Sequence, residues 1–208
     1  MLKRLFRGGK AKWRDLVNIL RYPALLKGFF VYSHLTSDER VCLYRLSKES
    51  QAGFSLEIGS YIGASAYFIS AGLVRKENGS QLLCVDTWSN DAMTEGHLDT
   101  WEEFCFNTKV CSSSIIPIRG YSTQVVDDVR RHTAHLSMLF IDGNHSYEGV
   151  KSDWESYKTL LHPGSVVIFH DYGWAEGVQR VVDEDVVPLV TCAQRLPNMW
   201  WGTITSQP

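Results

Sequence analysis

From about residue 54 onward, short apolar runs alternate with longer segments in which apolar residues recur every three or four positions. The short runs are typical of buried strands, and the three-to-four repeat is typical of amphipathic helices. Such alternation predicts an α/β fold with a mostly parallel sheet. The expected strands are 54–58, 82–85, 115–118, 136–141 and 166–169, with a closing antiparallel pair at 189–194 and 200–205. The expected helices are 64–75, one around Trp101 and Phe104, 123–131, 147–161 and 175–187.

The region before the first strand is predicted to be helical. Apolar residues have helical spacing over residues 10–30, and Pro23 should split that stretch. The sequence Thr-Ser-Asp-Glu at 36–39 is a capping signal for a further helix. We therefore expect a helical N-terminal extension, residues 1–50, followed by a single domain, residues 51–208.

Charge is distributed unevenly along the chain. The net charge of −2 argues against a nucleic-acid partner. Residues 1–27, however, hold eight Lys or Arg against one acid, Asp15. Because Trp13, Leu16 and Leu20 lie at turn spacing, we expect a helix that packs on the domain or on a second subunit of a homo-oligomer. The alternative is a basic amphipathic segment at an anionic membrane surface.

Cysteine usage and hydropathy predict a cytoplasmic protein. The five cysteines are odd in number and lack metal-site spacing, which favours a reducing compartment. The sequence has no apolar run that approaches the roughly 20 residues of a membrane span. Its start also lacks the pattern of a secretory signal.

The first strand ends in Glu57 and leads into a turn that contains Gly59 and Gly63. Ligands bind at this edge of a parallel sheet, and glycines let a backbone approach them closely. Tyr61 stands where a dinucleotide fingerprint needs its middle glycine, which disfavours a nicotinamide or flavin dinucleotide. An adenosyl group with an amino-acid tail fits better, with Glu57 receiving the ammonium. Alternatively, the glycines serve only a tight turn.

Two further strand ends fit the same ligand. Asp86 ends the second strand, where a carboxylate accepts hydrogen bonds from ribose hydroxyls, although a turn or capping role is the alternative. Ser122 follows the third strand, where an adenine ring would rest.

The fourth strand ends in Asp142, and His145 follows on the loop into a helix. A neutral imidazole there could take a proton from a substrate hydroxyl, whereas the alternative is a histidine that caps the helix. Four aromatic residues border this edge and could wall an acceptor pocket: Trp88, Tyr147, Tyr172 and Trp174.

Four stretches carry a family resemblance: EIGSYIGAS (57–65), VDTW (85–88), FIDGNHSYEGVKSD (140–153) and LLHPGSVVIFHDY (160–172). Over roughly residues 50–205 the chain resembles the class I S-adenosylmethionine-dependent methyltransferases. It most closely resembles the small O-methyltransferases grouped with macrocin O-methyltransferase and the cephalosporin hydroxylase-like proteins.

The resemblance implies a doubly wound, Rossmann-like sheet of seven strands with the last reversed, and S-adenosylmethionine as cofactor. Glu57, Gly59 and Gly63 would hold the methionine moiety, Asp86 the ribose and Ser122 the adenine edge. The full set of expected cofactor residues is Glu57, Gly59, Ser60, Tyr61, Gly63, Ser65, Asp86, Trp88, Ser122 and Asp142.

Many relatives also bind Mg²⁺ through carboxylates at the ends of strands 4 and 5, which Asp142 and Asp171 match. Relatives often have Asp-Asp or Asp-Asn at the end of strand 5, whereas this chain has His170 before Asp171. That difference bears on which divalent cation would bind, because imidazole suits softer ions than Mg²⁺.

The expected function is methyl transfer to a hydroxyl of a small molecule or sugar. Asp142 and His145 are the expected catalytic residues, with His145 as base and a cation held by Asp142, His170 and Asp171. The alternatives are transfer to nitrogen, a non-catalytic cofactor-binding scaffold that docks through its basic N-terminus, and an oxidoreductase, which the missing dinucleotide fingerprint disfavours.

Overall fold

A seven-stranded sheet forms the centre of the protein in the computed structural model, which describes residues 9–74, 79–89 and 96–206. Its strand order is β3-β2-β1-β4-β5-β7-β6, and β7 runs antiparallel to both of its neighbours. The first five strands pair in parallel, so their carboxyl ends lie at one edge of the sheet. The strands are β1 (Phe54–Ile58), β2 (Gln81–Asp86), β3 (Ile115–Arg119), β4 (Leu136–Ile141), β5 (Leu161–His170), β6 (Val190–Leu196) and β7 (Met199–Ile204).

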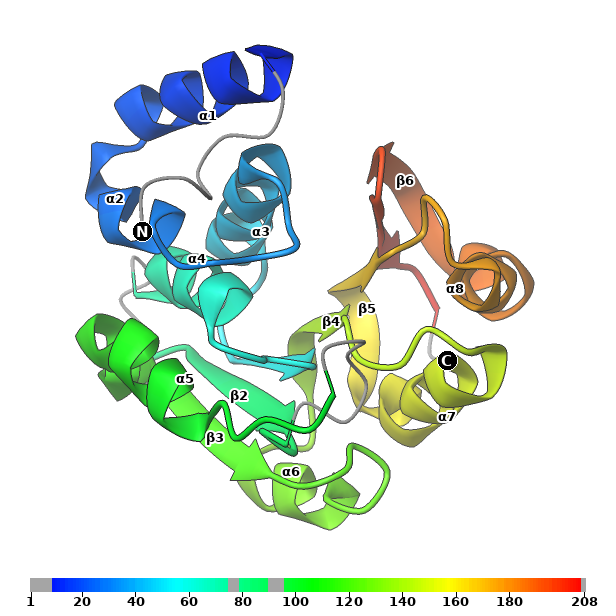
Figure 1. Ribbon diagram of the computed structural model, residues 1–208. Helices are drawn as coiled ribbons and strands as arrows, with labels where there is room; N and C mark the ends of the chain where they lie inside the picture. Colours follow the sequence, from blue (N-terminus) through cyan, green and yellow to red (C-terminus); the bar gives the residue numbers. More distant parts are fainter. Residues whose placement is uncertain (1–8, 75–78, 90–95, 207–208) are drawn as a thin grey trace.

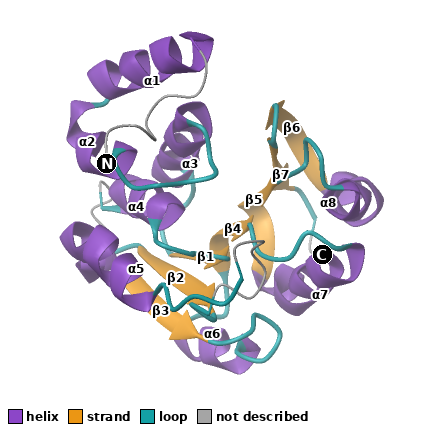
Figure 2. Ribbon diagram, in the orientation of Figure 1, coloured by secondary structure: helices purple, strands orange, loops and turns teal. Residues whose placement is uncertain are grey.

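Helices cover both faces of the sheet (Figures 1 and 2). One layer contains α3 (Ser37–Glu49), α4 (Ala64–Leu73) and α5 (Trp101–Thr108), and the other contains α6 (Val126–His132), α7 (Tyr147–Tyr157) and α8 (Glu176–Val181). Successive residues of β4 enter opposite cores: Leu139 packs with the α7 layer and Phe140 with the α4 layer. A strand buried on both faces has no polar alternation, which explains why every residue of β4 except Ser137 is apolar.

The N-terminal region is helical, as predicted. Helix α1 (Gly9–Arg21) is followed by a 3₁₀ turn (Pro23–Leu25) and a short helix α2 (Leu26–Phe29), so the chain breaks at the proline. Helix α3 begins with the predicted capping box, in which Thr36 and Glu39 bond each other's backbone N–H groups. The division at residue 50 into extension and domain stays a prediction.

Several boundaries differ from those expected. Strand β5 begins at Leu161 rather than 166, since its pairing with β4 continues across a register shift between Leu136 and Met138. The helix expected over 175–187 ends as an α-helix at Val181 and continues as a π-turn and a 3₁₀ turn. The end predicted at residue 75 for the helix expected over 64–75, which is α4, lies outside the described residues. Among the helices that the structure describes, none has the length and apolar character that a bilayer crossing requires.

Gly59 determines how closely β1 approaches β4 at the functional edge. Its φ of 87° lies in the left-handed region, and a Cβ built there would lie 2.1 Å from the carbonyl oxygen of Asp142. A side chain would therefore need both a strained backbone and a displaced strand end.

We expect Gly59→Ala to lower the free energy of unfolding by more than about 2 kcal/mol, because it adds a steric clash to the backbone strain. Gly53→Ala is the matched control, since Gly53 also has positive φ (134°) but has nothing within 4 Å of a built Cβ. Urea unfolding of both variants measures the difference. Equal losses in the two variants would show that the close approach to Asp142 is not tight.

Candidate active site

A cavity of about 1090 Å³ opens at the carboxyl ends of the parallel strands. Parallel sheets bind ligands at this edge. The segment between α2 and α3, residues 32–35, closes one side of it. The predicted site residues that line the cavity are Gly59, Ser60, Tyr61, Ser65, Asp86, Ser122, Asp142, His145, His170 and Asp171. Most of the predicted set is thus brought together around one space.

Glu57, at the end of β1, lies behind the cavity wall and is fully buried. Its Oε2 accepts a hydrogen bond from the Ser60 hydroxyl at 2.7 Å and lies 3.4 Å from the Cys84 sulfur. Burial raises the pKa of Glu57 to about 7, although the hydroxyls of Ser65 and Ser60 oppose the shift. Within the described part of the chain, Oε1 has no hydrogen-bond partner. Glu57 therefore acts on the cavity through the two serines and retains an unused acceptor.

Asp86 ties two loops together at the end of β2. Its carboxylate accepts the backbone N–H groups of Tyr61 and Trp88, both at 2.7 Å. Tyr61 and Trp88 both have positive φ, so these bonds hold tight turns beside the cavity. The Trp88 ring is fully buried against Trp101 and Phe104. Its expected place in a pocket wall is therefore wrong, and it serves the site through its backbone.

Gly63 also lies outside the cavity lining. It precedes α4 with φ 85°, and a Cβ there would lie 2.6 Å from the side chain of Thr108. Its role in this structure is the tight turn, the alternative that the sequence left open.

Ser122 lines the cavity together with a carboxylate that the sequence analysis missed. Its hydroxyl donates a short hydrogen bond to Asp153 of α7, and its carbonyl accepts the Tyr157 hydroxyl at 2.5 Å. Asp153 is buried, which raises its pKa to about 6. The sequence did contain a signal for this buried carboxylate. Asp153 lies three residues after Val150, on the apolar stripe of the helix, where a charged residue is unexpected.

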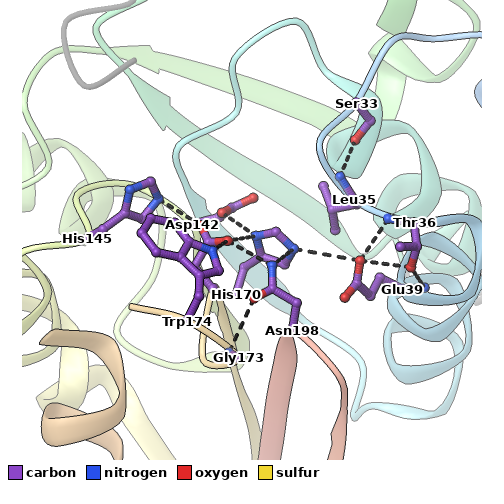
Figure 3. Close-up of polar contacts among 11 residues, drawn as sticks. Ser33, Leu35, Thr36, Glu39, Asp142, His145, His170, Gly173, Trp174 and Asn198 are labelled. Atoms are coloured by element: carbon purple, nitrogen blue, oxygen red, sulfur yellow. Dashed lines mark hydrogen bonds and ion pairs between the residues drawn. The ribbon is translucent and has the colours of Figure 1, made fainter. Parts of the chain in front are cut away.

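His170 lies among three carboxylates that come from three elements (Figure 3). Its Nδ1 is 3.0 Å from Asp142 Oδ1 and 3.3 Å from Asp171 Oδ1, and its Nε2 is 3.7 Å from Glu39 Oε2. Burial alone would lower the pKa of His170, but these carboxylates outweigh it and raise the pKa to about 12. At neutral pH the His170 side chain is therefore a buried cation.

Asp171 joins His170 to His145. Its Oδ2 lies 2.7 Å from His145 Nε2, and its Oδ1 accepts the indole N–H of Trp174 at 2.7 Å and the amide of Asn198 at 2.8 Å. Burial raises the pKa of Asp171, but these donors and His170 outweigh it and hold it well below its usual range. The bond to Asp171 in turn raises the pKa of His145. The arrangement is a histidine oriented by an ionised aspartate.

Two partners in this cluster were not predicted. Glu39 was recognised as a capping residue, yet nothing in its local sequence indicates the contact with His170. Asn198 lies between the two strands expected at 189–194 and 200–205, and no role in the site was predicted for it. Of the four aromatic residues expected around the acceptor, Trp174 lines the cavity, whereas Tyr147 and Tyr172 bond Glu184 and Asp183 elsewhere.

The predicted metal residues are also brought together. Asp142, His170 and Asp171 each offer a ligand atom, and these atoms lie within 4.8 Å of one another. The same geometry is satisfied by a proton on His170, since Nδ1–H can donate to both carboxylates.

A methyltransferase-domain family matches residues 56–172, more than half of the chain. The chain belongs to this methyltransferase family. The matched region runs from β1 to the residues just after β5 and includes most of the cavity edge. Together with the observed strand order, this confirms the expected class I methyltransferase fold.

Other proteins share part of the sequence or the fold. A curated relative, the uncharacterized protein y4gI of Sinorhizobium fredii, is 29% identical over 118 residues; the match covers 56% of this chain but only 13% of that protein. The O-methyltransferase NovP has a similar fold, with a TM-score of 0.69 at 12% identity, covering 95% of this chain and 100% of NovP. An O-methyltransferase from Bacillus cereus, solved with SAH, gives 0.65 at 14% identity, with 97% and 93% covered.

The raised pKa of Glu57 predicts a pH-dependent stability. A carboxyl with a pKa of about 7 when folded and about 4.5 when unfolded destabilises the fold as pH rises between these values. The difference corresponds to roughly 3 kcal/mol. Glu57→Gln should therefore flatten the loss of stability that the wild type shows from about pH 5 to 8. Unfolding midpoints across that range measure this, and an unchanged pH slope in the variant would contradict it.

Proposed function

We propose that this methyltransferase transfers the methyl group of S-adenosylmethionine to a hydroxyl oxygen of a small molecule or sugar. One observation carries the proposal: a carboxylate placed for a ribose, Asp86, and a histidine–aspartate pair, His145 and Asp171, line the same cavity. The O-methyltransferases of similar fold, one of them solved with SAH, support the donor and the acceptor atom.

The residues present fit the cofactor. Asp86 has two oxygens that each accept one backbone N–H, and each retains a lone pair for a ribose hydroxyl. The Ser60 and Ser65 hydroxyls line the cavity and suit a cationic amino-acid tail, with the Glu57 carboxyl behind Ser60. Asp153 beside Ser122 adds an acceptor where an exocyclic amine would lie.

When bound, S-adenosylmethionine supplies a methyl group that is already activated, so the chain must orient the acceptor and remove its proton. His145 presents Nε2 to Asp171, which leaves Nδ1 to take the hydroxyl proton as the oxygen–methyl bond forms. Asp171 stabilises the resulting imidazolium, as the aspartate of a catalytic triad does. His145 is one-third exposed, so it can pass the proton on to solvent.

A metal-assisted transfer is the second candidate, since Asp142, His170 and Asp171 cluster. The donor set fits a divalent ion poorly, however. Asp171 already accepts from His145, Trp174 and Asn198, and Nδ1 of His170 lies 3.0 Å from Asp142 Oδ1, so these ligand atoms are engaged with protein partners. This favours transfer driven by His145, with His170 supplying the positive charge.

Cofactor binding can be tested by calorimetry. The wild type should bind S-adenosylmethionine at micromolar levels, roughly −8 kcal/mol. Asp86→Asn should weaken binding at least about tenfold, because an amide loses the charge and half the acceptors. Asp99→Asn is the control, since Asp99 is exposed and lies outside the cavity lining. A wild type that binds NAD in preference, or no nucleotide at all, would overturn the proposal.

The base can be tested on an acceptor found by screening hydroxyl compounds with methyl-labelled cofactor. His145→Gln should lower the rate about 10²–10⁴-fold, the usual contribution of a general base, and leave cofactor affinity unchanged. His135→Gln, at an exposed histidine, should change neither. The wild-type rate should rise with pH through a pKa above the ordinary value for imidazole, and Asp171→Asn should move that limb to lower pH.

Chelation separates the two candidates. Activity should survive EDTA treatment if His145 is the base. Activity that vanishes with EDTA and returns with a divalent ion would make the metal-assisted route correct.

A further inference from the structure

Helix α1 is attached to the protein by one face. The Asn18 amide donates to Ser37 Oγ at 3.0 Å and to Asp38 Oδ1 at 2.7 Å, both at the start of α3. One turn later, the Tyr22 ring packs edge-on against Tyr44 at 5.8 Å. The predicted packing of this segment on the domain is therefore observed, and it fixes which side of α1 points away from the protein (Figure 1).

The outward side of α1 is apolar. Trp13 and Leu20 are 68% and 72% exposed, and Leu16 and Val17 between them are 45% and 41% exposed. The spacing i, i+3, i+4, i+7 places all four on one stripe of the helix. Large apolar side chains gathered on a solvent-facing stripe indicate a surface with a partner.

Basic residues border this stripe. At about 100° per residue, Arg14 and Arg21 fall along one edge of it. Both are exposed, and Arg14 also pairs with Asp38 of α3 at 3.2 Å, which leaves Arg21 as the basic residue on which the test relies. By sequence, α1 also contains Lys10 and Lys12. The one acid of residues 1–27, Asp15, falls on the side that faces α3 and is half-buried.

The rest of the chain has the opposite charge. Residues 28–208 hold 13 Lys or Arg against 22 Asp or Glu. The protein is thus an acidic body with one basic, apolar-faced helix on its surface. The partner that matches the helix is a surface with negative charge above an apolar layer.

We propose that α1 lies flat on an anionic lipid bilayer, with the stripe Trp13, Leu16, Val17 and Leu20 at the boundary between headgroups and acyl chains. Interfacial helices combine this kind of apolar stripe with Lys and Arg beside it, and anionic headgroups attract such residues. A second copy fits less well, because an isologous contact would bring the basic borders of two α1 helices together.

Sedimentation with vesicles tests this on the full chain. The protein should bind vesicles of phosphatidylcholine mixed equally with phosphatidylglycerol, and should stay in solution with phosphatidylcholine alone. The double variant Leu16→Gln, Leu20→Gln should lower the partition coefficient at least about tenfold. Arg21→Glu should lower it by about tenfold, and added salt should weaken wild-type binding.

The matched controls replace exposed residues of α5 and of the 3₁₀ turn that follows it, outside α1. Phe106→Gln removes an apolar side chain that is 79% exposed, and Lys109→Glu reverses an exposed charge. Neither should change vesicle binding. All variants replace exposed side chains, so their thermal unfolding midpoints should match the wild type, which separates lost binding from lost folding.

Three results would overturn the proposal. The first is no vesicle binding, or equal binding to neutral and anionic vesicles. The second is equal loss of binding in the α5 controls. The third is a dimer in lipid-free solution that the Leu16→Gln, Leu20→Gln variant converts to monomer, because the stripe would then be covered by a second copy of the chain.

Discussion

A buried cation, the His170 imidazolium, holds the functional edge of this sheet together. Its three carboxylate partners come from α3, from the end of β4 and from the end of β5. Any one of these carboxylates, buried alone, would be costly, and so would the cation without them. The cluster is therefore stable only as a unit. Its dependence on Glu39 makes α3, which precedes the matched methyltransferase region, a part of the active-site framework.

This charge cluster also explains how the two sides of the cavity differ. On the β1–β2 side, Asp86 and the serines in front of Glu57 present acceptors to a ligand. On the β4–β5 side, the acceptor atoms of Asp171 already bond four donors. One of these donors is Nε2 of His145, which Asp171 thereby orients. In the proposed function, one half of the cavity binds the cofactor and the other half removes the proton of the acceptor.

The sequence predicted those parts that depend on local pattern. The parallel strands are mostly apolar and end in polar residues, so the sequence predicted their order along the chain. Asp86, Asp142, His145 and Asp171 line the cavity, as expected. The sequence did not predict the contacts of Glu39 with His170 and of Asn198 with Asp171. Each contact joins residues that are far apart in the chain and forms only when the whole domain folds.

The direction of a side chain was the second feature that the sequence could not predict. Trp88 stands beside Asp86 in sequence, but its positive φ and its packing against Trp101 turn the ring into the core. Glu57 likewise lies near the end of β1, as predicted, yet its side chain is buried behind Ser60 and does not line the cavity. A residue's place at a strand end follows from pattern, whereas the face that it presents depends on the tertiary packing around it.

A crystal structure of the protein grown with SAH and Mn²⁺ tests the central claim most directly. The account predicts SAH in the cavity with its ribose hydroxyls on Asp86, His145 still bonded to Asp171, and no anomalous Mn²⁺ peak between Asp142 and Asp171. A Mn²⁺ ion bridging those two carboxylates would contradict the base-driven transfer. SAH bound away from Asp86 would contradict the assignment of the cavity itself.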